Sequence, residues 1–315
     1  MAALGHTGID LFELALGGNT FGWTSDREAS FAVMDAYLDG GGNLIDTADV
    51  YSAWAEGHSG GESETMIGEW LASRGRRDDV VIATKVSQHP EFSGLSAPTV
   101  KAAAEASLRR LGTDHIDLYY AHFDDAETPL EETVGAFEEL VRAGTIRAVG
   151  ISNYSADRVR EWFSIARREG WTVPAALQPH YNLVRRESYE ADLAGVGAQE
   201  NLAVMPYFAL ASGFLTGKYR GAEDLRGADR EQMASGYVSE EGLRVVSTLE
   251  EIAAGHGVTI PTVALAWLRS RPTVAAPIAS ARTTAQLPAL MESVRLQLGD
   301  DELAALDDVS ARVPA

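Results

Sequence analysis

The stretch Asn43-Leu44-Ile45-Asp46-Thr47-Ala48-Asp49-Val50-Tyr51 decides the fold predicted for the whole chain. Leu44-Ile45 ends a short apolar run after the turn signal Gly40-Gly41-Gly42, which predicts a strand. Asp46 stands where this strand should stop, and Tyr51 follows five residues later. The stretch therefore predicts a buried strand with a carboxylate at its end and a phenol in the loop beyond it.

Two later apolar runs end in the same way. Residues 80–84 run into Lys85, and residues 118–121 run into His122. Taken singly, such residues have ordinary explanations: an aspartate in a helix cap, a solvated lysine, a histidine in the core. Three successive strand ends that each carry an ionisable group instead favour a barrel of parallel strands, which builds its site at the C-terminal face.

Eight apolar runs of strand length are spaced along the chain, with amphipathic helical stretches between them. The strands are expected to begin near Leu14, Leu44, Val80, Ile116, Ile146, Ala175, Ala203 and Val274. This alternation is typical of an α/β fold of the (β/α)8 TIM-barrel class. An open dinucleotide-binding sheet would need a G-x-G-x-x-G turn, and Gly17-Gly18-Asn19-Thr20-Phe21-Gly22 lacks that spacing. We expect residues 1–315 to form a single barrel domain.

Caps and loops complete the predicted architecture. Ser25-Asp26-Arg27-Glu28 and Thr128-Pro129-Leu130-Glu131 have the capping-box pattern, the second with proline at the first helical position, and Ser155 precedes a helix that closes near Gly170. Residues 2–11 are expected to form a hairpin that closes the bottom of the barrel. The long segment 211–239 is expected at the C-terminal face, where extended loops serve as lids or ligand clamps.

The composition narrows the classes of function. Lys and Arg number 26 against 46 Asp and Glu, a formal net charge of −20, so a nucleic-acid partner is not expected. The sequence contains no cysteine, which excludes disulfides, thiolate nucleophiles and cysteine metal sites. With no signal-peptide pattern and no apolar stretch of membrane length, we expect a cytoplasmic protein without a membrane partner.

Asp46, Tyr51, Lys85 and His122 form a set suited to protonating an alkoxide. Tyrosine is a weak acid, with a reference pKa of about 10, and a nearby ammonium favours its phenolate. Asp46 would supply the counter-charge for Lys85, and His122 would orient a substrate carbonyl. The set has no nucleophile–base pair and no metal-ligand spacing, so acyl transfer and metal-assisted hydrolysis fit poorly and no metal is expected. Carbonyl reduction by an external hydride donor fits well.

These residues resemble the catalytic tetrad of the aldo-keto reductase family. The resemblance rests on Asp46-Thr47-Ala48 followed by Tyr51, on Lys85 and on Tyr119-Tyr120-Ala121-His122. It continues through Gly150-Ile151-Ser152-Asn153-Tyr154, Leu177-Gln178-Pro179-His180-Tyr181-Asn182, the run 207–219, Pro277-Ile278-Ala279-Ser280-Ala281-Arg282 and Gln286. It implies a (β/α)8 fold, NADP(H) as the cofactor and a small carbonyl or alcohol compound as the substrate.

The resemblance also implies where the cofactor binds. Ser152, Asn153 and Gln178 would hold the nicotinamide carboxamide, with Tyr207 stacked on the ring. Residues 213–218 would lie over the pyrophosphate, and Ser280 and Arg282 would meet the 2′-phosphate, which suits the bidentate grip of arginine. The full set expected at the cofactor is Thr20, Asp46, Ser152, Asn153, Gln178, Tyr207, Leu210, Gly213, Leu215, Gly217, Lys218, Ser280, Arg282 and Gln286.

The chain departs from the family pattern near the adenine and in the pocket. Ala289 and Leu290 stand where a Glu-Asn pair is common, and Ala279-Ser280 replaces a common Pro-Gly. The long C-terminal loop of steroid-reducing members is not expected, which would leave the pocket more open. Its expected walls are Trp23, Trp54 and Phe123, with Phe214 and Tyr237 as further candidates from the long segment.

The function indicated is NADPH-dependent reduction of an aldehyde or ketone, reversible as alcohol oxidation, with Tyr51 as the general acid. The alternative is a regulatory subunit that senses NADP with little turnover, because channel-associated members keep the same tetrad. A barrel hydrolase built on Asp46 and another carboxylate would leave Tyr51, Lys85 and His122 without a role.

Overall fold

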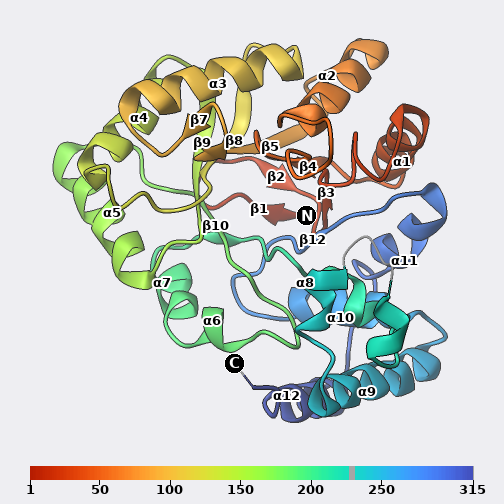
Figure 1. The fold of residues 1–315 in the computed structure, drawn as a ribbon. Coiled ribbons are helices and arrows are strands. Elements are labelled where there is room, and N and C mark those ends of the chain that lie inside the picture. Colours follow the sequence, from red (N-terminus) through yellow and green to blue (C-terminus); the bar gives the residue numbers. More distant parts are fainter. Residues whose placement is uncertain (227–230, 315) are drawn as a thin grey trace.

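The computed structural model describes residues 1–226 and 231–314. Eight parallel strands form one sheet in the order β11-β10-β9-β8-β5-β4-β3-β12 (Figure 1). Their bounds are Ala15–Gly17 (β3), Leu44–Asp46 (β4), Val81–Val86 (β5), Ile116–Ala121 (β8), Ile146–Ser152 (β9), Ala176–Gln178 (β10), Ala203–Val204 (β11) and Ile278–Ala279 (β12). This parallel sheet, with helices around it, confirms the predicted (β/α)8 fold.

The two outer strands of the sheet meet and curl it into a barrel. Val204 and Val274 form a parallel bridge, and the Ala275 amide donates to the Val204 carbonyl at 2.8 Å. Every other expected strand begins at the predicted residue or one residue later. At the last one, Val274 forms only this isolated bridge, and β12 begins at Ile278, where pairing with β3 starts.

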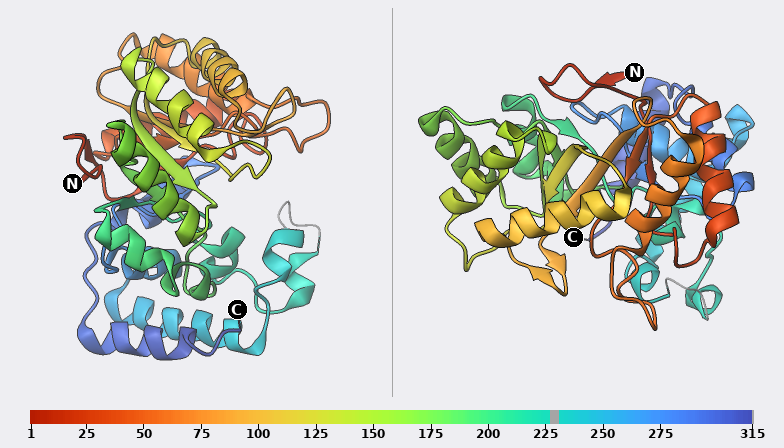
Figure 2. Two further views of the ribbon diagram at one scale, coloured as in Figure 1. Left: turned by 90° about the vertical axis from the view of Figure 1, so that its left-hand side faces the viewer. Right: turned by 90° about the horizontal axis from the view of Figure 1, so that it is seen from above.

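Helices surround the barrel and bury their apolar faces against it (Figures 1 and 2). Trp70, Trp162 and Trp267, on three different helices, are fully buried. The helices are α1 (Arg27–Asp39), α2 (Glu62–Arg74), α3 (Ala97–Leu111), α4 (Leu130–Arg142), α5 (Ala156–Glu169), α6 (Glu187–Glu190), α7 (Leu193–Gln199), α8 (Glu231–Ser235), α9 (Glu240–His256), α10 (Ile260–Arg269), α11 (Leu287–Glu292) and α12 (Asp300–Ser310), with the 3-10 turns η1 (Ala211–Thr216), η2 (Ala222–Leu225) and η3 (Thr284–Gln286). None of the helices in these described ranges is long and apolar enough to cross a bilayer.

Two of the three expected helix caps are wrong in detail. Asp26, and not Ser25, caps α1 by accepting from the Ala29 amide at 2.9 Å, because the Ser25 hydroxyl is turned to the Arg282 carbonyl. The Thr128 hydroxyl donates to Asp125 and does not cap α4. The third cap is confirmed: Ser155 accepts from the Arg158 amide, and α5 ends before Gly170.

The predicted N-terminal hairpin is present. Strands β1 (Ala2–Ala3) and β2 (Asp10–Leu11) pair antiparallel. Leu4 and Leu11 are fully buried in a core cluster with residues of the barrel strands, such as Leu44 and Leu118. In Figure 2, right, this hairpin lies at one end of the barrel, and the loops that follow the strands extend from the other. The hairpin therefore closes the bottom of the barrel.

The C-terminal face carries one hairpin that the sequence did not predict and the expected long segment. Strands β6 (Gln88–His89) and β7 (Phe92–Ser93) form the hairpin directly after β5. Within the long segment 211–239, η1, η2 and α8 are described, and the part of the predicted lid at 227–230 lies outside the described residues. α8 and α10 both contact η1, so the described part of the segment packs against the barrel.

Candidate active site

Lys85 lies at the centre of the candidate site. Its ammonium donates to Asp46 Oδ1 at 2.6 Å, to the Thr47 carbonyl at 2.6 Å and to the Tyr51 hydroxyl at 3.2 Å. The positions follow from the barrel: β4 ends at Asp46, its neighbour β5 carries Lys85, and Tyr51 lies in the loop beyond β4. The structure thus brings together three of the four residues of the predicted catalytic set.

The Lys85 side chain is charged although it is fully buried. Burial alone would lower its pKa, but the negative charge of Asp46 and the contact with Tyr51 raise that pKa above the ordinary value. A buried ammonium is tolerated when its donors are satisfied and a counter-ion is in contact. Lys85 therefore presents a positive charge to the Tyr51 hydroxyl.

His122 lies beside Tyr51 at the end of β8. The two rings are 6.4 Å apart between centroids, and burial, reinforced by the charge of Lys85, holds the pKa of His122 well below its usual range. The imidazole is therefore neutral. Its Nδ1 is buried without a hydrogen-bond partner in the described part of the chain. A buried N–H without a partner is rarer than a buried lone pair, so this favours the proton on Nε2.

The residues expected at the nicotinamide are linked to this set by hydrogen bonds. Gln178 Nε2 donates to Asp46 Oδ2 at 2.8 Å, and the Ser152 hydroxyl donates to the Gln178 carbonyl at 2.8 Å. Asn153, held at a positive φ of 56°, donates to the His122 carbonyl at 2.9 Å. Residues at the ends of β9 and β10 therefore hydrogen-bond to Asp46 and to the backbone of His122.

Tyr207 extends this array on the side of β11. Its hydroxyl donates to Asn153 Oδ1 at 2.7 Å, and its ring stacks on His180 with centroids 5.2 Å apart. His180 Nε2 in turn lies 2.9 Å from the Tyr237 hydroxyl. Tyr237 therefore anchors the end of the long segment to the barrel and is not a free pocket wall.

The segment expected over a pyrophosphate contains residues with positive φ and close backbone packing. Ser212 and Gly213 both have positive φ, at 57° and 94°, and the Ser212 hydroxyl is buried without a partner among the residues described. A side chain at Gly213 would come within 3.1 Å of Lys218 Nζ. Gly217, also at positive φ, leaves no room for a side chain against Ile260. Leu210 is partly buried, whereas the side chain of Leu215 lies in the core, so only its backbone can face a ligand.

The residues expected at the adenosine end lie together after β12. The Ser280 hydroxyl donates to Asn19 Oδ1 at 2.7 Å, and the Arg282 amide donates to Gln286 Oε1 at 2.7 Å. Thr20 is buried, with its hydroxyl 3.5 Å from the Ala281 carbonyl. Near them, the Leu290 side chain is buried in the core, so this departure from the family pattern offers no polar group here.

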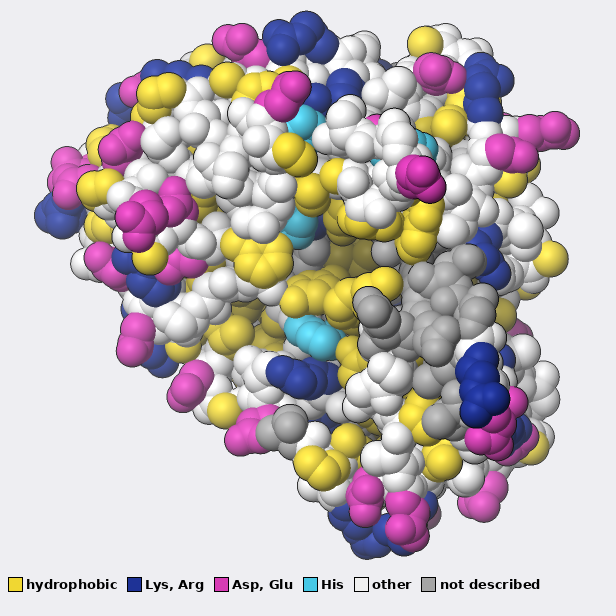
Figure 3. All heavy atoms as spheres, in the orientation of Figure 1, with side chains coloured by type: hydrophobic (Ala, Val, Ile, Leu, Met, Phe, Trp, Pro, Cys, Tyr) yellow, Lys and Arg dark blue, Asp and Glu magenta, His cyan; other side chains and the backbone are white. Residues whose placement is uncertain are grey.

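Aromatic side chains flank Tyr51 and His122. Trp54 packs edge-on against both Trp23, at 5.4 Å, and Tyr51, at 6.0 Å, while Phe123 packs on His122 at 5.0 Å. Trp54 is 51% exposed and Phe123 is 39% exposed. Figure 3 shows a hollow in the middle of this face, with hydrophobic side chains inside it and histidines along its edge. The three predicted wall residues are thus at the site.

Two points about the site were missed or wrong in the sequence-based prediction. Phe214 is not a wall: it is fully buried and stacks on Tyr237. The sequence pattern indicates no role for His180, which contacts both Tyr207 and Tyr237. Within the described residues, no group of His, Asp and Glu side chains is arranged to hold a metal ion.

The fold and the site define the class of protein. It is a parallel (β/α)8 barrel whose C-terminal face carries a buried lysine–aspartate pair in contact with a tyrosine. The model of the Aldo/keto reductase family matches residues 13–311. The chain belongs to this family.

Several curated proteins are similar to this chain over nearly its whole length. Protein tas of Escherichia coli (strain K12) is 32% identical, with 96% of this chain and 95% of that protein covered. Norsolorinic acid reductase stcV of Emericella nidulans is 33% identical, with 96% and 79% covered. A protein of Oryza sativa subsp. japonica named probable voltage-gated potassium channel subunit beta is 33% identical, with 92% and 90% covered. Family membership supports an oxidoreductase, and the family generally uses a nicotinamide cofactor.

Proposed function

We propose that the protein reduces aldehydes or ketones with NADPH and catalyses the reverse oxidation of alcohols. The observation that carries this proposal is the position of Lys85 Nζ, which contacts both Asp46 and the Tyr51 hydroxyl. A buried cation at this distance stabilises a phenolate, so Tyr51 can release its proton to an oxygen that gains negative charge. Such a group has a use in carbonyl reduction and none in the hydrolysis considered from the sequence.

The residues present fit a phosphate-bearing nicotinamide cofactor. The buried, unpartnered Ser212 hydroxyl and the Lys218 ammonium against Gly213 suit a pyrophosphate. Ser152, Asn153 and Gln178 would hold the carboxamide, Tyr207 would pack on the ring, and Ser280 and Arg282 would hold a 2′-phosphate. When bound, the reduced nicotinamide supplies a hydride.

The protein's own groups would manage the proton and the orientation of the carbonyl. Neutral His122, with its proton on Nε2, can donate a hydrogen bond to the substrate oxygen. Tyr51 would donate its proton to the same oxygen as it becomes an alkoxide, and Lys85 would stabilise the phenolate left behind. Trp54 and Phe123 would exclude water from one side of the carbonyl and pack against an apolar substituent.

A single-turnover experiment tests the proposal. The protein is loaded with one equivalent of NADPH and mixed with a panel of aliphatic and aromatic aldehydes, and the loss of absorbance at the reduced nicotinamide is followed. We expect a first-order decay whose rate constant depends on the aldehyde. Tight NADPH binding with no decay for any member of the panel would contradict the proposal.

That contrary outcome would favour the second candidate, a regulatory subunit that binds the cofactor with little turnover. Its supporting observation is the similarity to the rice protein named for a potassium channel. The two candidates share the cofactor site and differ only in hydride transfer, so the same experiment separates them.

A further inference from the structure

We propose that Arg185 is an anion-binding specificity residue at the mouth of the site, which selects aromatic carbonyl compounds that carry a carboxylate. This inference rests on the proposed function and names a substrate class for it. It starts from the loop that leaves β10 after Gln178 and carries His180 and Arg185.

The backbone at Arg185 is held firmly. Asn182 and Arg185 exchange two backbone hydrogen bonds, at 3.2 and 3.0 Å, and the Asn182 side chain donates to the Phe208 carbonyl. Asn182 Oδ1 also accepts from the Val184 amide at 2.9 Å. These bonds hold the Asn182–Arg185 turn against the loop that follows β11.

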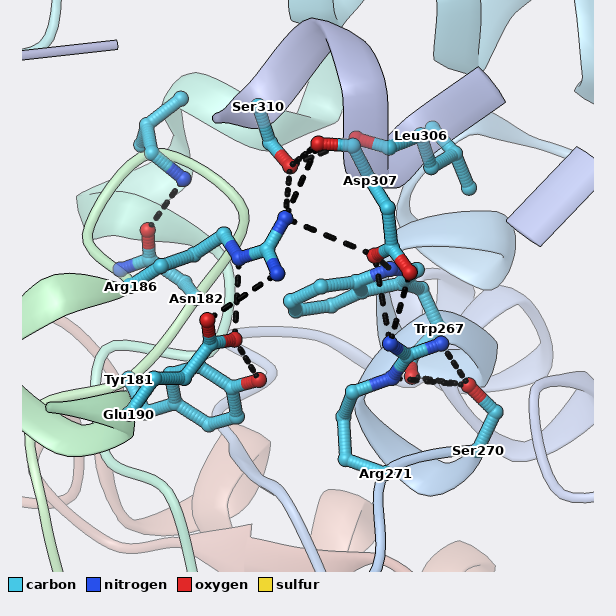
Figure 4. A network of polar contacts seen from close by, with 11 residues as sticks. Tyr181, Asn182, Arg186, Glu190, Trp267, Ser270, Arg271, Leu306, Asp307 and Ser310 are labelled. Atoms are coloured by element: carbon cyan, nitrogen blue, oxygen red, sulfur yellow. Dashed lines mark hydrogen bonds and ion pairs between the residues drawn. The ribbon is translucent and has the colours of Figure 1, made fainter. Parts of the chain in front are cut away.

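The next residue, Arg186, fixes the same turn from the other side and shows what a structural arginine looks like here. Figure 4 shows its guanidinium between Glu190 and the end of α12. It donates to both Glu190 oxygens, at 2.9 and 3.0 Å, to the Asp307 carbonyl at 3.0 Å and to the Ser310 hydroxyl at 2.8 Å. Four of the five N–H groups of Arg186 are therefore used within the protein.

Arg185 differs from Arg186 in its exposure and, within the described ranges, in its lack of side-chain partners. It is exposed, and among the residues described its guanidinium forms neither a hydrogen bond nor an ion pair. The chain has 46 acidic residues against 26 basic ones, and arginines such as Arg74, Arg158 and Arg220 contact carboxylates. An unpaired guanidinium on a preformed turn in so acidic a protein is available to an anion from solution.

The position of Arg185 relates it to the site. Burial, followed by the positive charge of Arg185, lowers the pKa of His180 to about 4. Tyr51 and Arg185 both act electrostatically on Tyr207, whose pKa burial raises to about 12. His180 stacks on Tyr207 and packs edge-on against Phe208, whose carbonyl holds the Asn182 side chain of the Arg185 turn.

The strand order sets the shape of the compound. Arg185 follows β10 and Trp54 follows β4, which lie four places apart in an eight-stranded barrel and hence on opposite sides of its mouth. Aromatic rings lie around this mouth: Trp54 packs on Tyr51, Phe123 on His122 and Tyr207 on His180. A flat aromatic ring could pack between these side chains, with its carbonyl group at Tyr51 and its carboxylate at Arg185.

The test compares acids with their methyl esters. The substrates are 3- and 4-formylbenzoic acid and the longer 4′-formylbiphenyl-4-carboxylic acid, each paired with its ester, which has the same ring system without the charge. The proteins are the wild type, Arg185→Gln and the control Arg295→Gln. Arg295 is also exposed, and it lies away from the site. Two residues before it, the Ser293 carbonyl accepts a hydrogen bond from Arg269, and Arg269 pairs with Glu13, which also contacts the N-terminus.

We expect the ratio of kcat/KM for acid to that for ester to fall about 2- to 5-fold in Arg185→Gln for at least one acid, the size of effect typical of an accessible ion pair. Raising the ionic strength should reduce the wild-type ratio, and Arg295→Gln should leave it unchanged. Equal ratios in wild type and Arg185→Gln for all three acids would overturn the proposal. A parallel loss of NADPH affinity in Arg185→Gln would overturn it too, since Arg185 would then serve the cofactor.

A binding measurement separates this proposal from the proposed function. Tryptophan fluorescence, with Trp23 and Trp54 at the pocket, reports the affinity of the three acids for the protein–NADP⁺ complex without turnover. If neither the acids nor the esters are reduced, the proposed function fails. A weaker affinity for the acids in Arg185→Gln than in wild type would still support the anion site, and equal affinities would sink it.

Discussion

Gln178 and Asp46 stand 132 residues apart in the chain, yet Gln178 Nε2 donates to Asp46 Oδ2 at 2.8 Å. The other oxygen of Asp46 contacts Lys85. One carboxylate therefore joins the residues expected to bind the nicotinamide to those expected to move the proton.

Gln178→Ala tests this link. Loss of the amide leaves one oxygen of a buried carboxylate unsatisfied, which costs about 1–3 kcal/mol in the free energy of unfolding. We expect a lower urea midpoint together with weaker NADPH binding by fluorescence titration. Gln199→Ala, at an exposed position on α7, should change stability by less than about 0.5 kcal/mol. Equal stability of the two variants would remove Gln178 from this network.

Tyr51→Phe should keep NADPH binding and lose most of kcat, because only the proton donor is removed. General acid catalysis contributes roughly 10²- to 10⁴-fold. Steady-state kinetics with one aromatic aldehyde, together with a cofactor titration, measures both effects. Wild-type turnover in Tyr51→Phe would show that another group is the acid.

Lys85→Met should abolish most activity, because the phenolate of Tyr51 loses the cation that stabilises it. In the residual activity, we expect the basic limb of the pH–rate profile to move to higher pH. The single variant also leaves Asp46 buried without its partner, which destabilises a protein by about 3–5 kcal/mol. The double variant Asp46→Asn with Lys85→Met is therefore measured as well. An unchanged profile in a folded variant would contradict the coupling between Lys85 and Tyr51.

Arg282→Ala should weaken NADPH binding much more than NADH binding. A hydrogen bond to a charged group contributes about 1.5–3 kcal/mol, or roughly 10- to 150-fold in affinity, and the net charge of −20 offers the 2′-phosphate no general attraction. Titration of both cofactors into wild type and variant gives the preference directly, with Arg295→Ala as a control for the loss of one charge. Equal losses for the two cofactors would mean that Arg282 does not bind the phosphate.

The stability of the protein should fall on acidification partly because of His180. Burial, with help from Arg185, lowers its pKa to about 4 in the folded state, whereas an unfolded histidine takes up a proton near pH 6.5. Between these values the unfolded state binds more protons, so this contribution is complete above pH ~6.5 and is lost toward pH ~4. The loss is at most about 1.4 kcal/mol per pH unit and less here, because the ring is partly exposed to screening solvent.

Urea unfolding at pH 7 and pH 5 measures this effect. His180→Gln should lose less stability than wild type between the two values. His6→Gln, at an exposed position, should behave as wild type does. The same pH dependence in all three proteins would exclude a contribution from His180.

The sequence predicts the barrel and the positions of the ionisable groups well because both follow from local patterns. Apolar runs of strand length give β4, β5 and β8, and the strand ends place Asp46, Lys85 and His122 at one face. Contacts between distant segments leave no such pattern. The turn of Ser25 toward Arg282 displaced a predicted cap, and the burial of Phe214 against Tyr237 removed a predicted wall. An unpaired arginine also cannot be told from a paired one until its neighbours are in place, as Arg185 and Arg186 show.

The hairpin that closes the bottom of the barrel has a practical consequence for experiments. Leu4 and Leu11 pack among residues of the barrel strands, and Met1 lies at the end of the barrel opposite the mouth of the site. An affinity tag, a fluorophore or a sensor surface joined at Met1 is therefore expected to leave the entrance for both cofactor and substrate facing the solution. The N-terminus is the natural handle for every measurement described above.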